Sequence, residues 1–463
     1  MNYYLAVDIG ASSGRHILCH IENGQLMLEE VYRFKNQVVY KNGHYCWDID
    51  YLFEAILEGI RQCVKVNKIP QTMGIDTWAV DYVLLDKNNR LLTDAYAYRD
   101  SKNDKGVQRV LDCLSFEKLY QKTGIQFQKF NTIYQLKSYD KQIVDKAQTY
   151  LMIPDYFNYL LTGKKVNEYT NMSTTQLLDI QTNQMDQTLL KEMKIPQHIF
   201  QKMVMPATVI GYLTQEVQDL VGCQLKVVVP ATHDTGSAYM AAIEDNSIIL
   251  SSGTWSLLGI ETLKPYINQK ALEANFTNEG GYNYRYRFLK NIMGLWIIQE
   301  VSRNLEGKYS FGELVKLARE NPFDGIFDVN DDRFLKPEHM ISEIQKYFQE
   351  RNQKYPQSVG EIAYCVYHSL AYCYKKAIEE LEDLTQQTYT TINIIGGGCQ
   401  NELLNEMIAE VTHKKVVAGP IEATALGNIL AQLLSQGIIY NLDEGRRMIK
   451  QSFEIKEYKG GEQ

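Results

Sequence analysis

The sequence has 463 residues, of which 45% are hydrophobic and 22% are charged, and its formal net charge is -8. This length predicts two large domains, and the ordinary composition excludes a disordered or fibrous chain. The acidic balance, without a cluster of basic residues, argues against nucleic acid or an anionic membrane as a partner.

We also see no pattern of a membrane span, a signal peptide or closely spaced cysteines. No apolar run approaches the ~20 residues of a membrane span, and residues 1–8 enter a strand pattern without the basic start of a signal peptide. The eight cysteines are scattered without a Cys-x-x-Cys pair, which argues against a zinc site and a disulfide framework. We therefore expect a cytoplasmic protein with free thiols, either a monomer or a small homo-oligomer.

Residues 4–34 predict three consecutive strands, with a hairpin turn at Asn23-Gly24. The link between the first two strands is the polar run Asp8–Arg15 (DIGASSGR). Its two glycines allow positive φ and close backbone approach, and its serines and N–H groups suit phosphate oxygens, whose charge Arg15 offsets. Asp8, at the strand end, can hold Mg²⁺ through water. A long polar hairpin without a ligand is the alternative.

A second polar segment follows a predicted helix over residues 50–66 and a strand over residues 73–76. Acids, an aromatic face and an arginine gather there: Asp76, Thr77, Trp78, Asp81, Tyr98, Arg99 and Asp100. A polyhydroxylated sugar needs such acceptors, a stacking surface and a donor fork. Alternatively, Trp78 fills a core and Arg99 forms a surface pair with Asp100.

The stretch over residues 226–256 organises the chain. A β-branched strand over 227–229 leads to the turn Thr232–Gly236, a small-residue helix follows over 237–243, and a strand over 248–250 ends in Ser251-Ser252-Gly253-Thr254. Asp234 in the first turn is placed as a reactive carboxylate, and the second turn offers hydroxyls and N–H groups to an anion. Together they suggest chemistry on a phosphate, and two ordinary strand–loop–helix corners are an equal alternative.

In the C-terminal part, a helix is expected from Leu289, with Asn291 and Gln299 as polar exceptions near the site. The strand over residues 391–395 ends in Gly396-Gly397-Gly398, where a base or ribose can lie against bare backbone. Small residues over 422–428 predict a helix that packs closely on a neighbour. Because both halves open with a strand into a Ser/Gly turn, we expect a duplicated α/β domain with a deep cleft between the copies.

These motifs together resemble the FGGY family of carbohydrate kinases, which has the actin-like, ribonuclease-H-like ATPase fold. The resembling segments follow one another over nearly the whole chain: 6–15 (AVDIGASSGR), 74–78 (GIDTW), 80–81 (VD), 98–100 (YRD), 124–127 (GIQF), 154–157 (PDYF), 233–235 (HDT), 251–256 (SSGTWS), 290–296 (KNIMGLW) and 396–401 (GGGCQN). Within the family they most resemble the kinases of L-rhamnulose, which use ATP and Mg²⁺ to phosphorylate its 1-hydroxyl.

The resemblance implies a role for each candidate residue. An N-terminal domain, residues 1–243, binds the sugar and supplies the catalytic base, Asp234, and a C-terminal domain, residues 244–463, binds the nucleotide. Sugar contacts fall on Trp78, Ala79, His233, Asp234, Thr235 and Asn291. ATP contacts fall on Ala11, Ser12, Ser13, Gly14, Arg15, Thr254, Gln299, Gly396, Gly397 and Gly398, and the metal falls on Asp8.

One departure and three alternatives bear on function. The family pattern has glycine where this chain has Ala79, and the added β-carbon is expected to narrow the sugar pocket. The substrate is then open between L-rhamnulose and another ketose, such as L-fuculose or xylulose. An actin- or chaperone-like ATPase would hydrolyse ATP without sugar, and a sugar sensor would lack the intact acids and Ser/Gly turns.

Overall fold

The structure is a computed structural model that describes residues 1–461. These residues form two compact units that interleave along the chain. Unit 1 comprises Met1–Ala241, Glu261–Phe288 and Ala423–Ser452, and unit 2 comprises Ala242–Ile260, Leu289–Glu422 and the described residues from Phe453 on. The single division after residue 243 stays a prediction.

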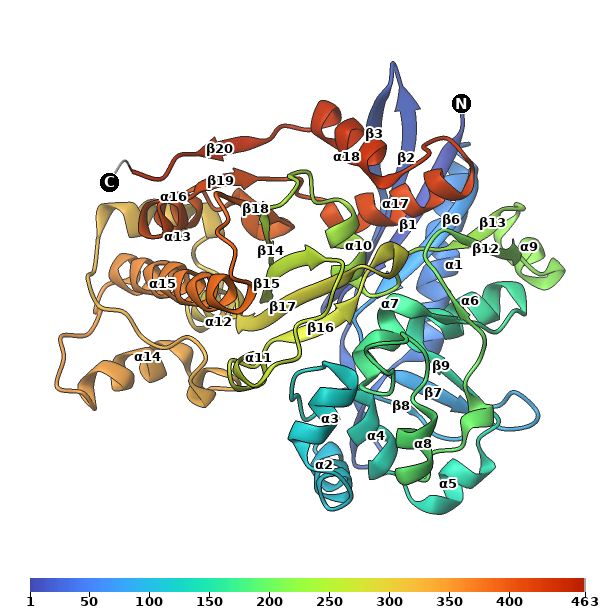
Figure 1. Ribbon diagram of the computed structural model, residues 1–463. Helices are drawn as coiled ribbons and strands as arrows, with labels where there is room; N and C mark the ends of the chain where they lie inside the picture. Colours follow the sequence, from blue (N-terminus) through green and yellow to red (C-terminus); the bar gives the residue numbers. More distant parts are fainter. Residues whose placement is uncertain (462–463) are drawn as a thin grey trace. The chain divides into compact units, whose positions relative to one another are not determined.

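Unit 1 is built on a six-stranded sheet in the order β12-β13-β6-β1-β2-β3 (Figure 1). The strands are β1 (Tyr3–Ile9), β2 (Ser13–Glu22), β3 (Gln25–Lys35), β6 (Pro70–Thr77), β12 (Thr208–Tyr212) and β13 (Lys226–Val229). Strand β1 runs antiparallel to β2 and parallel to β6, and β13 runs parallel to β6. The predicted hairpin at Asn23-Gly24 joins β2 to β3, with Glu22 opposite Gln25, and is confirmed.

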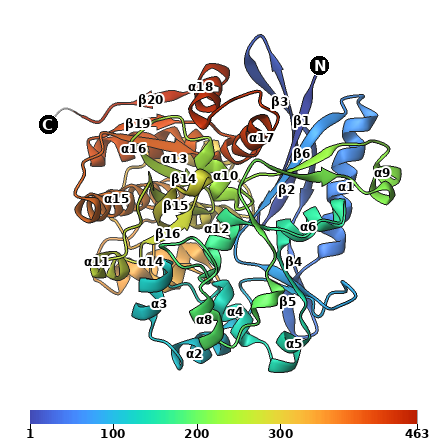
Figure 2. The ribbon, with the colours of Figure 1, turned by 45° about the vertical axis from the view of Figure 1, so that its right-hand side comes forward.

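Helices pack on this sheet because its central strand is buried from Tyr4 to Ile9. Helix α1 (Ile49–Lys65) confirms the predicted helix, and its apolar residues Leu52, Ile56, Ile60 and Cys63 are buried. Helix α17 (Ala423–Ser435) packs along β1 and β6, as Figures 1 and 2 show. It also packs on α10 (Asp234–Met240), so closely that a β-carbon on Gly427 would lie 1.8 Å from the Ser237 carbonyl oxygen. The predicted close packing of this small-residue helix is confirmed.

Smaller elements complete unit 1. Its short strands are β4 (Val38–Lys41), β5 (His44–Trp47), β7 (Tyr82–Leu85), β8 (Ala95–Tyr96), β9 (Thr149–Met152), β10 (Asn167–Glu168) and β11 (Met203–Val204). Its other helices are α2 (Asn103–Leu111), α3 (Phe116–Thr123), α4 (Thr132–Ser138), α5 (Lys141–Lys146), α6 (Ile153–Thr162), α7 (Tyr169–Met172), α8 (Gln187–Glu192), α9 (Gln215–Val221), α11 (Gln269–Glu273) and α18 (Leu442–Ser452). Single 3-10 turns cover Ser173–Thr175, Gln197–Ile199 and Tyr282–Tyr284.

The second sheet has seven strands in the order β16-β17-β15-β14-β18-β19-β20. They are β14 (Ile248–Ser252), β15 (Trp255–Thr262), β16 (Thr277–Gly280), β17 (Tyr286–Met293), β18 (Thr391–Ile395), β19 (Lys415–Ala418) and β20 (Lys456–Tyr458). Strand β14 runs antiparallel to β15 and parallel to β18, which runs parallel to β19. The order β17-β15-β14-β18-β19 therefore repeats β3-β2-β1-β6-β13, and the expected duplication of an α/β domain is confirmed.

The helices of unit 2 are α12 (Trp296–Asn304), α13 (Phe311–Glu320), α14 (Met340–Gln349), α15 (Val359–Thr385) and α16 (Glu402–Thr412), with 3-10 turns at Asp332–Phe334 and Gly397–Gln400. The helix expected from Leu289 is wrong in its first half, because that segment belongs to β17 and the helix begins at Trp296. Alternate aromatic and branched residues in Tyr286–Met293 suit a strand, and Gly294 separates the two elements.

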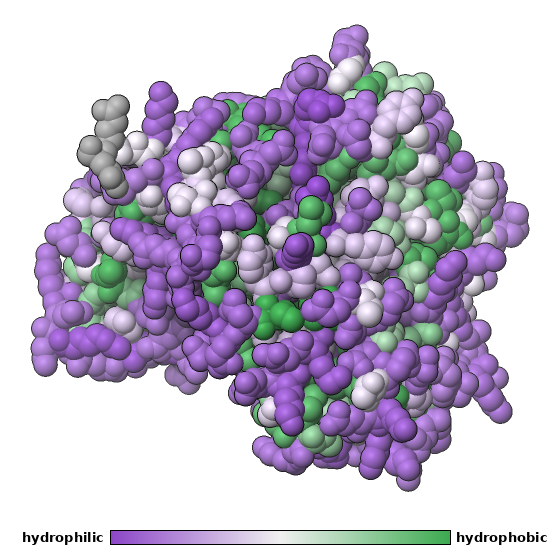
Figure 3. Space-filling view, viewed as in Figure 1, coloured by the Kyte–Doolittle hydropathy of each residue, from purple (hydrophilic) through white to green (hydrophobic). Residues whose placement is uncertain are grey.

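On the face shown in Figure 3, hydrophilic side chains predominate and apolar ones form small separate groups. Among the described residues, no helix combines the length and the apolar character needed to cross a membrane.

Candidate active site

Two carboxylates of unit 1 lie side by side where parallel strands end. Asp8 in β1 is in register with Asp76 in β6, and with Arg15 across the hairpin. Arg15 Nη2 lies 3.1 Å from Asp8 Oδ2. Asp76 is fully buried, its Oδ2 accepts a hydrogen bond of 2.7 Å from Asn428, and its Oδ1 has no hydrogen-bond partner in the part of the chain that the structure describes. Burial, with the Asp8 charge in second place, raises the pKa of Asp76 well above its ordinary value.

The turn between β1 and β2 is a tight and partly exposed hairpin. The Gly10 N–H donates to the Ser13 carbonyl, and the Asn36 side chain donates to the Gly10 carbonyl. Ala11 and Ser12 are exposed at the tip. Neither Gly10 nor Gly14 uses the positive φ that glycine allows. Gly14 is needed for space instead, since a β-carbon there would lie 2.1 Å from the Phe34 ring.

Asp234 is the first residue of helix α10, which follows the buried strand β13 and both begins and ends three residues earlier than the helix expected over residues 237–243. Its Oδ1 accepts hydrogen bonds from the Thr235 backbone N–H at 2.6 Å and from the Thr235 hydroxyl at 3.2 Å. His233 Nε2 lies 3.4 Å from the same oxygen. Burial raises the pKa of Asp234, and the neighbouring Asp8 charge acts in the same direction, whereas the hydrogen bonds from Thr235 oppose the shift. The side chain is still 33% exposed, so a ligand can reach it.

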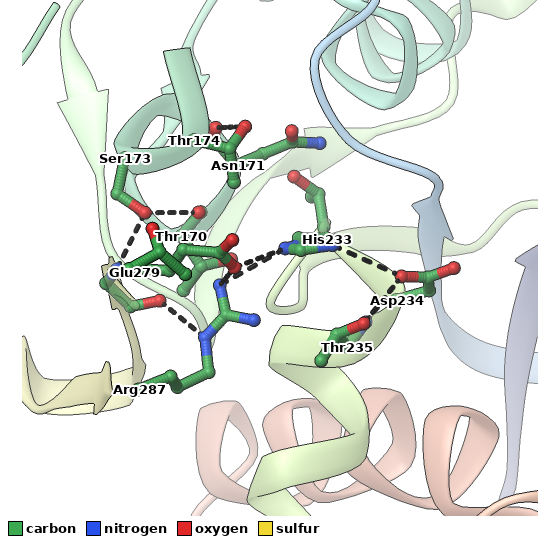
Figure 4. Close-up of polar contacts among 12 residues, drawn as sticks. Thr170, Asn171, Ser173, Thr174, His233, Asp234, Thr235, Glu279 and Arg287 are labelled. Atoms are coloured by element: carbon green, nitrogen blue, oxygen red, sulfur yellow. Dashed lines mark hydrogen bonds and ion pairs between the residues drawn. The ribbon is translucent and has the colours of Figure 1, made fainter. Parts of the chain in front are cut away.

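On its Nδ1 side, His233 contacts an ion pair that the sequence did not predict (Figure 4). Its Nδ1 lies 3.2 Å from Arg287 Nη2 and 3.4 Å from Glu279 Oε2. Arg287 and Glu279 are 3.1 Å apart, and Arg287 is fully buried. Burial would raise the pKa of Glu279, but the Arg287 charge holds that pKa below its ordinary value.

The predicted sugar segment is fixed by Asp81, a second residue whose role was missed. Asp81 Oδ2 accepts from the indole N–H groups of Trp47 and Trp78 at 2.6 and 2.9 Å, and the two indole rings are 4.0 Å apart. Burial raises the pKa of Asp81 to about 6 against the pull of these donors. Trp78 is only 6% exposed, whereas Ala79 is half-buried. The Trp78 ring is therefore part of the core, as the alternative reading of the sequence expected. Ala79 is the more accessible of the two residues.

The backbone after Ala79 turns sharply. The Asp81 N–H donates to the Ala79 carbonyl, and Val80 between them has φ 67°. Positive φ is rare for a β-branched residue and marks stored strain. The Thr132 hydroxyl donates to the Val80 carbonyl at 2.7 Å and holds the turn in place. No local pattern in the sequence marks this turn.

The turn that carries His233 is tied down by Glu168 at the end of β10. The fully buried carboxylate accepts from the Thr232 backbone N–H at 3.0 Å and from the Thr232 hydroxyl at 2.9 Å. Thr170 and Asn171 also donate to it from the first turn of α7. On the other side, the Thr77 N–H donates to the Thr232 carbonyl. The His233 turn is thus joined to strand β6 and to helix α7.

In unit 2, the predicted phosphate turn is the hairpin between β14 and β15. The Gly253 N–H donates to the Trp255 carbonyl, and the Leu295 N–H donates to the Gly253 carbonyl. The Thr254 hydroxyl lies 3.4 Å from Gln299 Oε1. The structure therefore brings together two of the residues expected to contact the nucleotide.

The triple glycine lies beside the same hairpin. A β-carbon on Gly398 would lie 2.0 Å from Ser252 Oγ, and Gly396 has φ 82°. A β-carbon on Gly397 would meet no atom within 4 Å. Ser252 Oγ is buried without a hydrogen-bond partner. Gly396 and Gly398 are thus required by the fold, and Gly397 leaves its backbone open to a ligand.

Asn291 lies in β17 and belongs to unit 2, whereas the other predicted sugar contacts belong to unit 1. It was expected on a helix, and that placement is wrong. Its Oδ1 is buried and has no hydrogen-bond partner among the described residues. A buried amide oxygen without a donor is available to a ligand hydroxyl.

Comparison with known families matches both parts of the chain. Residues 3–241 match the N-terminal domain of the FGGY family of carbohydrate kinases, and residues 248–435 match its C-terminal domain.

Curated relatives cover nearly the whole chain. A rhamnulokinase of Halalkalibacterium halodurans is 52% identical over 462 residues, which span 99% of both chains. A rhamnulokinase of Bacillus subtilis is 45% identical over 98% of this chain and 94% of its own.

Solved structures confirm the fold. The ligand-bound xylulose kinase of Lactobacillus acidophilus has a TM-score of 0.81 at 18% identity and covers 100% of this chain and 94% of its own. The glycerol kinase of Plasmodium falciparum with ADP has a TM-score of 0.78 at 17% identity and covers 100% of this chain and 95% of its own. With two duplicated sheets and a match along both parts of its length, this chain belongs to the FGGY family of carbohydrate kinases.

Proposed function

We propose that this carbohydrate kinase phosphorylates L-rhamnulose at its 1-hydroxyl, with ATP as the phosphoryl donor and Mg²⁺ as the metal. The relatives named rhamnulokinase, at up to 52% identity over nearly the full length, support the choice of sugar. The family resemblance of His233-Asp234-Thr235 supports the placement of the chemistry.

The single observation that carries the mechanism is the environment of Asp234. Thr235 and His233 both face Oδ1, and no hydrogen bond or ion pair between described residues uses Oδ2. Oδ2 is therefore the oxygen that accepts the proton of the attacking sugar hydroxyl. Because burial raises its pKa, the carboxylate is a stronger base than an exposed aspartate.

Phosphoryl transfer depends mainly on positioning and on stabilisation of charge. We assign Arg15 and the N–H groups of Ala11, Ser12, Ser13 and Gly14 to the phosphate oxygens of ATP. In unit 2, we assign Thr254, Gln299 and the triple glycine to the nucleotide. The open backbone at Gly397 supports that assignment.

The acids of unit 1 fit Mg²⁺. This metal keeps several waters and binds through one or two carboxylates plus substrate phosphates, rather than in a cage of protein ligands. Asp8 lies at a strand end beside Asp76, whose Oδ1 is buried without a partner. We propose that Asp8 holds the metal through water. When bound, Mg²⁺ supplies positive charge to the phosphate oxygens.

We also propose that the enzyme works in the cytoplasm. All eight cysteines are free, which is typical of proteins in a reducing compartment. Burial raises the pKa of most of these thiols, for example that of Cys19 to about 12, so they stay protonated and unreactive.

The experiment is ADP release with ATP and Mg²⁺ across L-rhamnulose, L-fuculose, D- and L-xylulose and L-ribulose, each against a blank without sugar. Highest turnover with L-rhamnulose, and a phosphate on carbon 1 by phosphorus NMR, is the expected result. A different preferred ketose would overturn the substrate and point to Ala79, and Ala79→Gly tests whether its β-carbon narrows the pocket. Turnover in the blank equal to that with sugar would instead favour a bare ATPase.

A further inference from the structure

His233 lies between two acids and one buried cation, all in unit 1 (Figure 4). Asp234 faces its Nε2, while Glu279 and Arg287 face its Nδ1. Titratable groups on neighbouring elements also act on the cluster: Asp8 of β1 acts on Asp234, and Tyr169 of α7 interacts with the Arg287 charge. The Tyr239 ring of α10 lies 5.9 Å from the Arg287 guanidinium, and burial raises the pKa of its hydroxyl. The imidazole thus has one charged neighbour on its substrate side and an ion pair behind it.

The donors and acceptors decide where the imidazole proton lies. A guanidinium has only donors, so Arg287 Nη2 can bond to Nδ1 only when that nitrogen carries a lone pair. The proton of a neutral imidazole is then on Nε2, which points at Asp234 Oδ1. Arg287 Nε meanwhile donates to the Gly280 carbonyl at 2.9 Å, which fixes the plane of the guanidinium.

We propose that Arg287 is a positioning residue that keeps His233 neutral, with its proton on Nε2, and so preserves Asp234 as a base. Arg287 does this in two ways: it occupies Nδ1, and it offsets the charge of Glu279. The inference rests on the proposed role of Asp234. It goes beyond that role because it assigns a purpose to a buried pair that does not touch Asp234.

Removal of Arg287 changes the balance around the imidazole. Glu279 Oε2, already 3.4 Å from Nδ1, becomes an acceptor without its counter-charge. The imidazole then takes a second proton and lies as a cation between two carboxylates. A positive charge 3.4 Å from Asp234 Oδ1 lowers the proton affinity of that carboxylate. The base becomes weaker, and the sugar hydroxyl is deprotonated less readily.

The burial of the pair agrees with a role in the site rather than in stability. Arg287 is fully buried and the Glu279 side chain is 8% exposed, so both ions have left water. Buried ion pairs often give no net stability over apolar residues of similar size. Arg287 Nη1 is also buried and has no hydrogen-bond partner within residues 1–461, which adds to the cost of placing the cation there.

The test compares Arg287→Met with the double variant Arg287→Met/Glu279→Gln. The single variant keeps the acid behind His233 and loses the cation, whereas the double variant loses both charges. Arg285→Met is the matched control, because Arg285 is 44% exposed two residues away and lies 4.0 Å from Glu261. Arg287→Gln carries the same expectation as Arg287→Met and replaces it if that protein does not fold, which thermal unfolding reports.

The first readout is nitrogen NMR of protein labelled in histidine, near pH 7.5, with the His233 signals assigned by a His233→Asn variant. We expect one protonated nitrogen, Nε2, in the unaltered enzyme, in Arg285→Met and in the double variant. We expect two protonated nitrogens in Arg287→Met. An unchanged His233 in Arg287→Met would overturn the proposal, whatever happens to turnover.

The second readout is turnover of the best ketose against pH. Arg287→Met is expected to lower kcat about 10- to 100-fold and to move the acid limb of the profile to lower pH, and the double variant to regain most of that loss. A loss of kcat without the NMR change would make Arg287 merely structural. Because the NMR state of His233 is read without turnover, this proposal and the role of Asp234 fail separately, the latter if Asp234→Asn stays active.

Discussion

The hairpin β1–β2 of unit 1 and the hairpin β14–β15 of unit 2 hold the same place in two sheets of the same topology, yet they differ in charge. Asp8 is the penultimate residue of β1 and lies beside Arg15 and Asp76, whereas Ser252 ends β14 beside Ser256 and the triple glycine. The shared topology places both turns at the ends of parallel strands, and the residues decide what each turn does. The hairpin of unit 1 therefore carries ionisable groups, and the hairpin of unit 2 offers hydroxyls and bare backbone.

Among the changes to the two hairpins, we expect the loss of the Arg15 charge to reduce activity most. We expect Arg15→Met to lower kcat/KM about 100-fold, because the cation nearest the proposed phosphate site is lost. Arg33→Met is the control, since Arg33 is opposite Arg15 in the sheet but pairs with Glu30 on the exposed side. Steady-state ADP release measures both. Equal losses in the two variants would refute a local role for Arg15.

The second hairpin should respond to shape rather than to charge. Gly397→Ala adds a β-carbon in open space, so we expect an unchanged Tm and a KM for ATP raised about tenfold. Gly398→Ala forces a clash with Ser252 and should lower Tm as well as affinity. Calorimetry and ATP titration separate the two effects. An unchanged KM for ATP in Gly397→Ala would remove this glycine from the nucleotide site.

The hydrogen bonds accepted by Asp81 predict that Asp81→Asn lowers stability, although it keeps the shape of the side chain. Its two carboxylate oxygens accept from Trp47, Trp78, Gln135 and the Tyr98 N–H. Asp81→Asn replaces one acceptor by a donor, so at least one of these buried groups loses its partner at a cost of about 2–3 kcal/mol. Urea unfolding at pH 7 measures the change. A free energy of unfolding equal to that of the unaltered protein would contradict this prediction and show that the four donors find other partners.

For Asp76, we expect the change to asparagine to raise stability, by less than Asp81→Asn lowers it. The folded-state pKa of Asp76 is raised, so its contribution to stability is present at low pH and is lost as pH rises from about 4 through the folded value. Asp76→Asn removes that loss and should raise Tm by a few degrees at pH 8 in metal-free buffer, but not at pH 4. A higher Tm at both pH values would indicate that the gain does not come from ionisation.

Local signals allowed much of the fold and part of the site to be predicted from the sequence. The strand-and-turn patterns at Asp8 and Gly396–Gly398 are short and are confirmed, and at Asp234 the strand is confirmed while the helix begins three residues earlier than expected. The contact of Arg287 with His233 joins residues 54 positions apart, and the hydrogen bond from Thr232 to Glu168 joins residues 64 positions apart. No local pattern in the sequence marks such pairs. Strand β17 was mistaken for helix because its apolar residues fit both periods.

Asp234→Asn tests the central claim, that the carboxylate of unit 1 accepts the proton of the sugar hydroxyl, most directly. The change keeps the shape of the side chain and removes its basicity. The account predicts that kcat with the best ketose falls by about 10³-fold or more, while sugar binding measured by calorimetry and the thermal unfolding curve stay close to those of the unaltered enzyme. Turnover within about tenfold of the unaltered enzyme, with the fold intact, would contradict it.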